Sequence, residues 1–199
     1  MMSAPFLFDS YRELSQTNRE AGAIFERFIQ KYLLTDPEYS ARYSKVWLWS
    51  EWPGRGGQPN TGIDLVAFDE KTGEYTAIQC KFFAEKAYID KADIDSFLAT
   101  SGKKFVIDGK EHTFSYRLIV SSTERWGKNA EEAIHDQAIP VFRIGLSDIA
   151  NAPMDWDYFS AEKPETLRLS SKKSIRPHQE KALNAVMEGF TKSQRGKLI

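Results

Sequence analysis

The segment Tyr116-Arg117-Leu118-Ile119-Val120 constrains the fold of this 199-residue chain more than any other feature. An almost continuous apolar run of this kind is typical of a central strand that is buried on both faces of a sheet. A helix is predicted near residues 128–137, where Ala130, Ala133 and Ile134 share one side. A strand at residues 141–144 follows, and Ser147-Asp148-Ile149 is predicted to cap a short final helix.

The first part of the chain supplies a helix and further strands. From Asn18 to Thr35 the apolar residues recur at the spacing of one helix face, with Asn18 as the predicted N-cap and Asp36-Pro37 as the end. A hairpin is expected around Thr72-Gly73. The predicted strands of this part comprise residues 46–49, 63–68, 75–83 and 105–107, with a helix near residues 93–100. The fold class that this order predicts is α/β, a mixed sheet flanked by helices.

The composition excludes several classes of protein. Apolar residues make up 41% of the chain, enough for a full core, and no apolar run is long enough for a membrane span or a secretion leader. We therefore expect a soluble, cytoplasmic protein. Cys80 cannot form an internal disulfide, and three scattered histidines cannot build a zinc cluster. A hard cation on oxygen ligands is the metal that these residues favour.

The charge is divided unevenly along the chain. Residues 1–167 hold 19 Lys and Arg against 26 Asp and Glu, a net charge of -7, whereas residues 168–199 hold 8 against 2, a net charge of +6. The chain therefore changes character near residue 165. If the acidic part acts on DNA, a region outside it must hold the polyanion.

The predicted hairpin brings together the residues that can carry chemistry. Asp64 lies on its first strand, and Gln79 and Lys81 share one face of its second strand. Hydrolysis of a phosphodiester needs oxygen ligands for Mg²⁺ and a nearby cation. In this interpretation Asp64, Gln79 and the main-chain carbonyl of Cys80 bind the metal, while Lys81 contacts the scissile phosphate or the attacking water. Glu26, on the flank of the first helix, is the candidate for a further carboxylate ligand.

Plainer interpretations stand beside this one. Asp64, Gln79 and Lys81 can form a solvated sheet edge with a weak salt bridge. Trp47, Trp49 and Trp52 can stack on DNA, although aromatic residues beside a strand more often belong to a core. Ser121, Ser122 and Lys128, near a helix N-terminus, are candidates for contacts with the DNA backbone.

The sequence resembles the Mrr-like branch of the PD-(D/E)XK restriction endonucleases. The motifs that carry the resemblance, over roughly residues 18–150, are Gly22-Ala23-Ile24-Phe25-Glu26, Gly62-Ile63-Asp64-Leu65-Val66, Gln79-Cys80-Lys81, Ile119-Val120-Ser121-Ser122-Thr123 and Asn129-Ala130-Glu131-Glu132-Ala133. The resemblance implies an endonuclease that cleaves double-stranded DNA with Mg²⁺, for which Mn²⁺ can substitute. Gln79 stands where a carboxylate is commoner in the broader superfamily, so tight metal binding without substrate is not expected.

A second resemblance lies in the basic tail. Ile175-Arg176-Pro177-His178-Gln179 is similar to the adenine-recognition element of superfamily-2 helicase motors, in which the glutamine reads the base. This implies a nuclease domain at residues 1–160, a linker at 161–175 and the start of a motor at 176–199, with a strand beginning at residues 196–199. The phosphate-binding loop is absent, so ATP would serve only the full-length motor.

A nuclease joined to such a motor resembles the amino terminus of Type ISP restriction-modification enzymes. That family implies unspecific cleavage by this domain, partner helicase, methyltransferase and target-recognition domains in the same polypeptide, and transient pairing of two nucleases on DNA. The alternative from another class is a catalytically silent module that docks DNA or braces the motor. A structure-selective nuclease resembling the archaeal junction resolvases is a third possibility, which the helicase-like tail disfavours.

Overall fold

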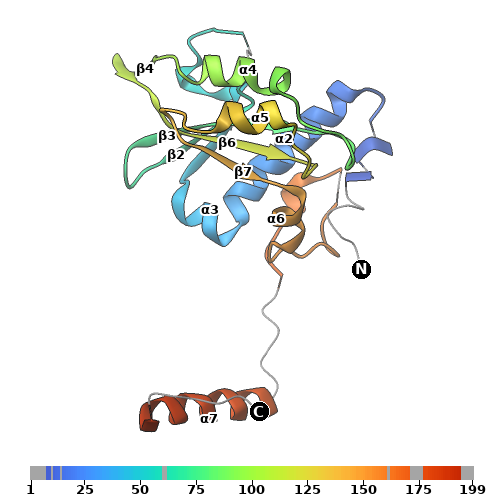
Figure 1. Ribbon diagram of the computed structural model, residues 1–199, viewed down its shortest axis with the longest axis vertical. Helices are drawn as coiled ribbons and strands as arrows, with labels where there is room; N and C mark the ends of the chain where they lie inside the picture. The colour runs from blue at the N-terminus through green and yellow to red at the C-terminus, as the bar shows by residue number, and fades with distance from the viewer. Residues whose placement is uncertain are drawn as a thin grey trace.

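The computed structural model describes residues 8–9, 11–13, 15–59, 62–160, 162–170 and 177–193. Its main sheet has five strands in the order β1-β2-β3-β6-β7 (Figure 1). The strands are β1 (Lys45–Leu48), β2 (Leu65–Asp69), β3 (Glu74–Lys81), β6 (Phe114–Ser121) and β7 (Val141–Ile144). The pairs β1–β2 and β2–β3 are antiparallel, whereas the pairs β3–β6 and β6–β7 are parallel. The predicted α/β class is therefore confirmed.

Helices cover the sheet, and one more helix follows the domain. They are α2 (Asn18–Thr35), α3 (Pro37–Arg42), α4 (Lys91–Thr100), α5 (Lys128–Ile134), α6 (Leu146–Asn151) and α7 (Pro177–Ser193). Three short 3-10 helices are also present: η1 (Trp49–Glu51), η2 (Pro53–Arg55) and η3 (Pro164–Thr166). Within the described residues, none of these helices combines the length and apolar character that a membrane span needs.

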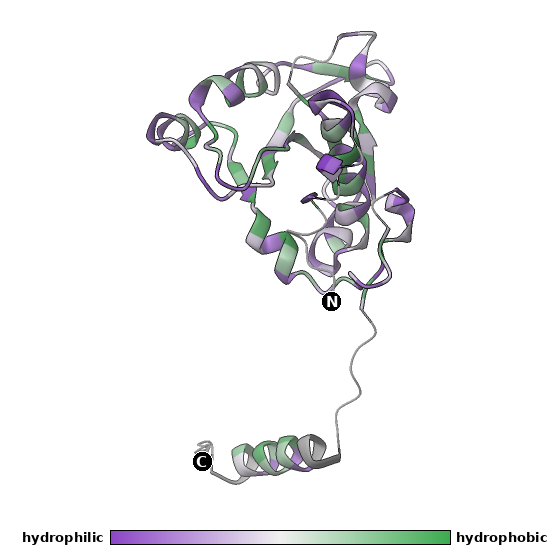
Figure 2. Ribbon diagram, turned by 90° about the vertical axis from the view of Figure 1, so that its right-hand side faces the viewer, coloured by the Kyte–Doolittle hydropathy of each residue, from purple (hydrophilic) through white to green (hydrophobic). Residues whose placement is uncertain are grey.

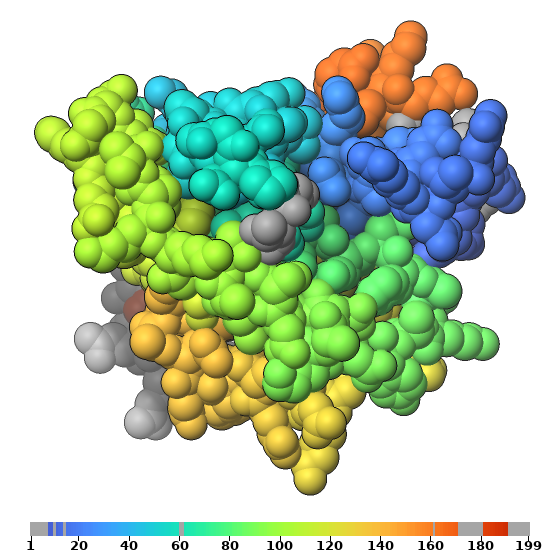
Figure 3. Space-filling view, turned by 90° about the horizontal axis from the view of Figure 1, so that it is seen from above, coloured from blue at the N-terminus to red at the C-terminus, as the bar shows by residue number. Residues whose placement is uncertain are grey.

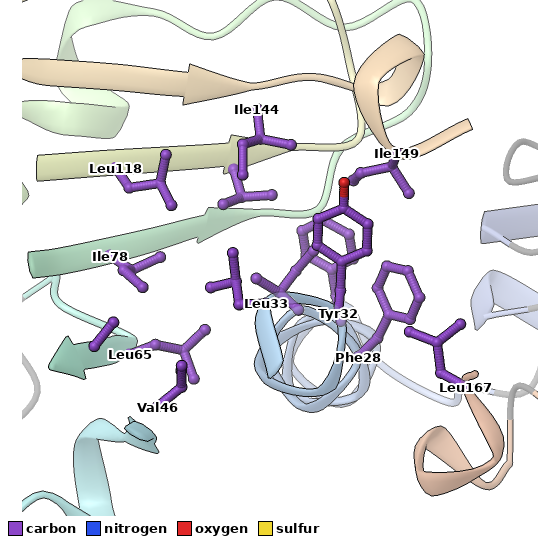
Figure 4. Packing of buried hydrophobic residues seen from close by; sticks show 14 of the residues in the cluster. Phe28, Tyr32, Leu33, Val46, Leu65, Ile78, Leu118, Ile144, Ile149 and Leu167 are labelled. Atoms are coloured by element: carbon purple, nitrogen blue, oxygen red, sulfur yellow. The ribbon is translucent and has the colours of Figure 1, made fainter. Parts of the chain in front are cut away.

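The first core lies between α2 and the sheet. Phe28, Tyr32 and Leu33 of α2 are buried against Ile78 and Leu118, and Figure 4 shows these side chains reaching from the helix toward the strands. Burying aromatic and aliphatic side chains contributes about 1.5–3 kcal/mol each to folding. This packing fixes α2 across one face of the sheet, which sets the position of every residue on the helix flank.

The second core lies on the other face of the sheet. Ile94 and Phe97 of α4 and Ala130 of α5 pack there with Trp49 and Trp52. Both indole rings are buried and Trp47 packs against the same cluster, which confirms the core interpretation of these tryptophans. In Figure 2 the apolar ribbon segments of the strands lie inside the domain.

Several local features differ from the sequence prediction, and one of them is that Asp64 directly precedes β2 and does not lie on it. The N-cap of α2 is Thr17 and not Asn18, because the Thr17 hydroxyl accepts a hydrogen bond from the Glu20 N–H. The predicted strand at residues 105–107 is β4 (Phe105–Ile107), but it pairs with β5 (Lys110–His112) in a separate two-stranded sheet. Asp108 and Gly109, both with positive φ, form the turn between them.

The basic tail is described in part. Leu167 is buried in the first core, so the folded unit extends at least through this residue. The amphipathic helix predicted from Pro177 is α7, and Figure 2 shows apolar ribbon segments along it. Its apolar residues Leu183, Met187 and Phe190 are exposed. The side chain of Gln179 and the predicted strand at residues 196–199 lie outside the described part. The division into nuclease, linker and motor stays a prediction.

Candidate active site

Asp64 is held at the end of the β2–β3 hairpin by three backbone contacts. Its N–H donates to the Ile78 carbonyl at 2.9 Å, and its carbonyl accepts from the Trp49 N–H at 2.8 Å. One carboxylate oxygen, Oδ2, accepts from the Cys80 N–H at 2.8 Å. Because these bonds fix both backbone and side chain, the carboxylate has a defined position beside the end of β3.

Glu26 reaches the same place from α2. Burial and, to a smaller extent, the negative charge of Asp64 raise the pKa of the Glu26 carboxyl to about 7, against a small opposing effect of Arg27. This effect places the Glu26 and Asp64 carboxyl groups within electrostatic range of each other. The assignment of Glu26 as a second carboxylate ligand stays a prediction.

Gln79 is buried in β3, one residue before Cys80. Only 2% of its surface is exposed, and its Oε1 atom has no hydrogen-bond partner among the described residues. A buried amide oxygen without a partner is unfavourable by about 1–3 kcal/mol. Such an orphaned acceptor is an oxygen that a cation or a water molecule would satisfy.

Lys81 is the last residue of β3 and is half-buried. Within the described part of the chain its ammonium group forms no ion pair or hydrogen bond, so the charge is free to meet an anion. The Cys80 thiol is affected by these charges: burial raises its pKa, Asp64 and Glu26 raise the pKa further, and Lys81 lowers it. Asp64, Glu26, Cys80 and Lys81 therefore belong to one electrostatic cluster.

The chain that follows Lys81 is tied down by hydroxyl groups from the end of β6. The Ser122 hydroxyl donates to the Phe83 carbonyl at 2.7 Å and accepts from the Phe83 N–H at 2.8 Å. The Thr123 hydroxyl lies within 2.9 Å of the carbonyls of Glu85 and Ala87. These long-range bonds hold residues 82–87 beside the cluster.

The same bonds overturn one prediction. Ser121 and Ser122 are each 1% exposed, and their hydroxyls bond within the protein, so they cannot contact a DNA backbone. The positioning role of Ser122 and Thr123 was not predicted, because a short sequence gives no sign of which distant carbonyls a hydroxyl will meet. Lys128 is exposed at the start of α5, and its role in DNA binding stays a prediction.

The cluster is poor in anionic ligands. Among the described residues no group of three or more His, Cys, Asp or Glu side chains is arranged to hold a metal ion. The oxygen donors of the cluster are two carboxylates and the Gln79 amide, together with any main-chain carbonyl that turns toward them. These donor types are suited to a hard cation more than to zinc, and the assignment of the ligands stays a prediction.

The sequence matches the restriction endonuclease family Mrr_cat_2 over residues 34–166, which is more than half of the chain. The chain belongs to the restriction endonuclease family. Asp64, Gln79 and Lys81 fall inside the matched range, and Glu26 precedes it. No curated protein sequence matched the chain.

Comparison with solved structures supports the same family. The structure described as ATP-dependent Type ISP restriction-modification enzyme LlaBIII bound to DNA is 33% identical over 100% of this chain, with a TM-score of 0.73. The chain spans 12% of the length of that enzyme. The predicted resemblances to Mrr-like restriction endonucleases and to Type ISP enzymes are therefore confirmed.

Two further restriction endonucleases are more distant. The MspJI restriction endonuclease in complex with a 27-mer oligonucleotide is 16% identical over 74% of this chain and 30% of its own, with a TM-score of 0.44. The DNA modification-dependent restriction endonuclease AspBHI is 15% identical over 96% of this chain and 40% of its own, with a TM-score of 0.45.

Proposed function

We propose that this chain is the DNA-cleaving domain of an ATP-dependent, single-polypeptide restriction-modification enzyme. It hydrolyses phosphodiester bonds of double-stranded DNA without sequence specificity of its own. The observation that carries the proposal is the Asp64 carboxylate, fixed by the Cys80 N–H at the end of the hairpin and within electrostatic range of Glu26, in a restriction endonuclease fold. The likeness over the whole chain to a Type ISP enzyme bound to DNA supports the substrate class and the larger polypeptide.

The donor set fits a divalent metal, for which we propose Mg²⁺ with Mn²⁺ as a substitute. Asp64, Gln79 through its orphaned Oε1, the Cys80 carbonyl and Glu26 would hold the ion. When bound, the cation would polarise the scissile phosphate and lower the pKa of the attacking water. A neutral glutamine in place of a second β-strand carboxylate should make metal binding weak until the DNA phosphate adds its own charge.

The residues of the chain would divide the remaining work. The Cys80 N–H fixes the Asp64 carboxylate through the 2.8 Å bond, so this ligand is positioned before substrate arrives. The unpaired ammonium of Lys81 would contact the scissile phosphate or orient the water. Glu26, whose pKa is about 7, would exist in both protonation states near neutral pH and could accept a proton from the nucleophile.

The remaining parts of the enzyme would supply what this domain lacks. With a net charge of -7 over residues 1–167, the domain repels DNA at long range. A helicase motor that uses ATP, a methyltransferase and a target-recognition domain in the same polypeptide would deliver the DNA and choose the site. Gln179 would then read adenine in that motor, and pairing of two nuclease domains would cut both strands.

The test is nicking of supercoiled plasmid by the chain with Mg²⁺ or Mn²⁺, compared with the Asp64→Ala variant. We expect metal-dependent nicking that falls by at least about 100-fold in Asp64→Ala. Asp95→Ala is the matched control, because Asp95 is an exposed carboxylate on α4 that pairs only with Lys91. Nicking that survives in Asp64→Ala at the level of Asp95→Ala would contradict the proposal.

The neutral Gln79 and the acidic charge favour a second candidate, a silent nuclease-like module that docks DNA beside the motor. Nicking by the unaltered chain separates the two, and the Gln79→Glu variant then tests the role of residue 79 in metal binding. A working nuclease already nicks DNA, and the new carboxylate should only tighten its metal binding. A silent module would show no nicking in the unaltered chain, alone or within the full-length enzyme.

A further inference from the structure

Gly22 lies within α2, and no feature of the described fold requires a glycine at this position. A glycine inside a helix is less favourable than alanine because its backbone loses more freedom on folding. Such a residue is often kept because a neighbouring element passes too close for a Cβ atom. At Gly22 an added Cβ would meet nothing within 4 Å. The reason for the missing side chain therefore lies outside the described structure.

The open space beside Gly22 is a cavity of about 900 Å³ next to the candidate active site. One wall is the first turns of α2, including Asn18 and Gly22, and the other is the end of β3 with the chain after it, residues 80–84. Figure 3 shows these two segments, blue and green, side by side on the face that is seen from above. The Ser122 and Thr123 hydroxyls fix the second wall, so the cavity is a built groove.

The groove leads away from the catalytic carboxylates. Asn18, Gly22 and Glu26 are spaced four residues apart, so they follow one another along a single helix face, about 6 Å apart along the helix axis. Gly22 lines the cavity together with Cys80 and Lys81. On α2 it is the next position from Glu26 toward the helix N-terminus, and Glu26 is within electrostatic range of Asp64. A strand whose scissile phosphate lay at Asp64 and Glu26 would pass Gly22 with its adjoining sugar and phosphate.

The charge of the groove suits a polyanion, unlike the acidic domain around it. Arg12 and Lys81 line it, and no Asp or Glu side chain is among the described residues that do. Arg12 donates to the Asp9 carboxylate and the Phe83 carbonyl, each at 2.6 Å, so Asp9 offsets its charge. Lys81 is then the cation of the groove that has no ion pair among the described residues. The positive end of the α2 dipole points the same way. Glu20, the acidic residue of the first turn, accepts from the Gln16 N–H and does not line the groove.

We propose that this groove holds the sugar–phosphate backbone of the DNA strand next to the bond that is cut, in direct contact with the bare Cα of Gly22. The proposal rests on the proposed nuclease function and adds a positioning residue to it. Any side chain at residue 22 would then occupy space that the DNA needs, although it would be harmless or favourable to the protein alone.

The experiment uses three variants of the chain: Gly22→Ala, Gly22→Leu and the matched control Ala23→Leu. Ala23 is the exposed neighbour of Gly22 and does not line the groove. Three quantities are measured: affinity for a short fluorescein-labelled duplex without metal, nicking of supercoiled plasmid with Mg²⁺, and the melting temperature.

We expect Gly22→Leu to weaken duplex binding by about tenfold or more and to reduce nicking with it, because the side chain blocks the strand. Gly22→Ala should raise the melting temperature by about 2–4 °C while binding DNA less well than the unaltered chain. Ala23→Leu should match the unaltered chain in binding and nicking. A variant that is more stable and yet binds less DNA cannot be explained by damage to the fold.

Equal binding and nicking by Gly22→Leu and Ala23→Leu would overturn the proposal, and so would an unaltered chain that does not bind the duplex. If Gly22→Leu does not fold, Gly22→Ala decides. The two functions remain distinguishable: nicking that is lost in Asp64→Ala but not in Gly22→Leu leaves the nuclease and removes the groove. Duplex binding that depends on residue 22 without any nicking leaves the groove and removes the nuclease.

Discussion

Arg117 and Gln79 are both buried polar residues on neighbouring strands of one sheet, yet their surroundings are opposite. Arg117 on β6 is 4% exposed, and its guanidinium donates to Ser101 Oγ at 2.7 Å, the Leu98 carbonyl at 2.8 Å and Gln137 Oε1 at 3.0 Å. Gln79 on β3 is 2% exposed, and its Oε1 has no partner among the described residues. The two strands are hydrogen-bonded neighbours.

The difference separates a polar group that holds the fold from one that is available for chemistry. Buried polar groups are normally hydrogen-bonded, because an unpaired one loses its hydrogen bonds to water and gains none within the protein. The Arg117 network follows this rule and ties β6 to α4 and to the end of α5. Gln79 departs from it at the place where Asp64, Glu26 and Lys81 also gather. We interpret the departure as the mark of the site.

The largest effect on stability should come from removing the hydrogen bonds of Arg117. Arg117→Met would leave the Ser101 hydroxyl, the Leu98 carbonyl and the Gln137 amide without their partner in the protein interior. We expect a loss of about 3 kcal/mol in the free energy of unfolding, measured by urea denaturation. The control is Arg143→Met, because Arg143 is an exposed residue whose ion pair with Glu131 contributes at most about 1 kcal/mol. Similar losses in both variants would mean that the hydrogen bonds of Arg117 contribute no more to stability than an exposed ion pair.

The periodicity of the sequence was sufficient to predict the helices and strands, but not the hydrogen bonds that buried polar side chains form. The spacing of apolar residues gave α2, and the alternation of side chains gave the β2–β3 hairpin, whose turn has Gly73 at a φ of 75°. The N-cap of α2 could not be assigned in this way, because Thr17 and Asn18 are both suitable residues and only the hydrogen-bond geometry identifies Thr17. The β4–β5 hairpin was only half predicted because β5 is polar, although Asp108-Gly109 is a recognisable turn signal.

The site could be predicted where its residues share one hairpin and less well where they do not. Gln79 and Lys81 lie on β3, and Asp64 directly precedes β2, which a short turn joins to β3, so local rules place them near one another. Arg117 meets acceptors from α4 and from the end of α5, and the groove beside Gly22 is formed by segments about 60 residues apart. Such meetings depend on how the whole chain packs, which no local pattern encodes.

The next effect is a pH-dependent gain in stability when Glu26 is replaced. Burial and Asp64 raise the pKa of Glu26 from its usual 4.5 to about 7 in the folded protein, so between these values the folded state holds a proton that the unfolded state has released. The free energy of unfolding therefore falls as the pH rises from 4.5 to 7, and the whole loss is present above pH 7. Glu26→Gln removes this loss.

We expect Glu26→Gln to be more stable than the unaltered chain by about 1–2 kcal/mol at pH 8, once solvent screening of the half-buried carboxyl is allowed for. Below pH 4.5 the difference should vanish. The measurement is urea denaturation across this pH range, with the exposed Glu162→Gln as the control for general loss of charge. A gain that is the same at every pH would show that Glu26 is not strained by its surroundings, and would weaken its assignment beside Asp64.

The smallest effect on stability, and the sharpest test of the comparison, should come from Gln79→Leu. Leucine has a similar volume and no polar atom, so it removes the orphaned Oε1 without opening a large cavity. We expect the free energy of unfolding to stay within about 1 kcal/mol of its original value or to rise, while metal-dependent nicking is lost. The matched control is Gln137→Leu, which removes an acceptor that Arg117 uses at 3.0 Å and should therefore lower stability by about 1–2 kcal/mol.

If Gln79→Leu instead destabilised the fold as much as Gln137→Leu did, the Gln79 amide would have a structural partner after all. The contrast between a residue that holds the sheet together and one kept for chemistry would then fail at its central position.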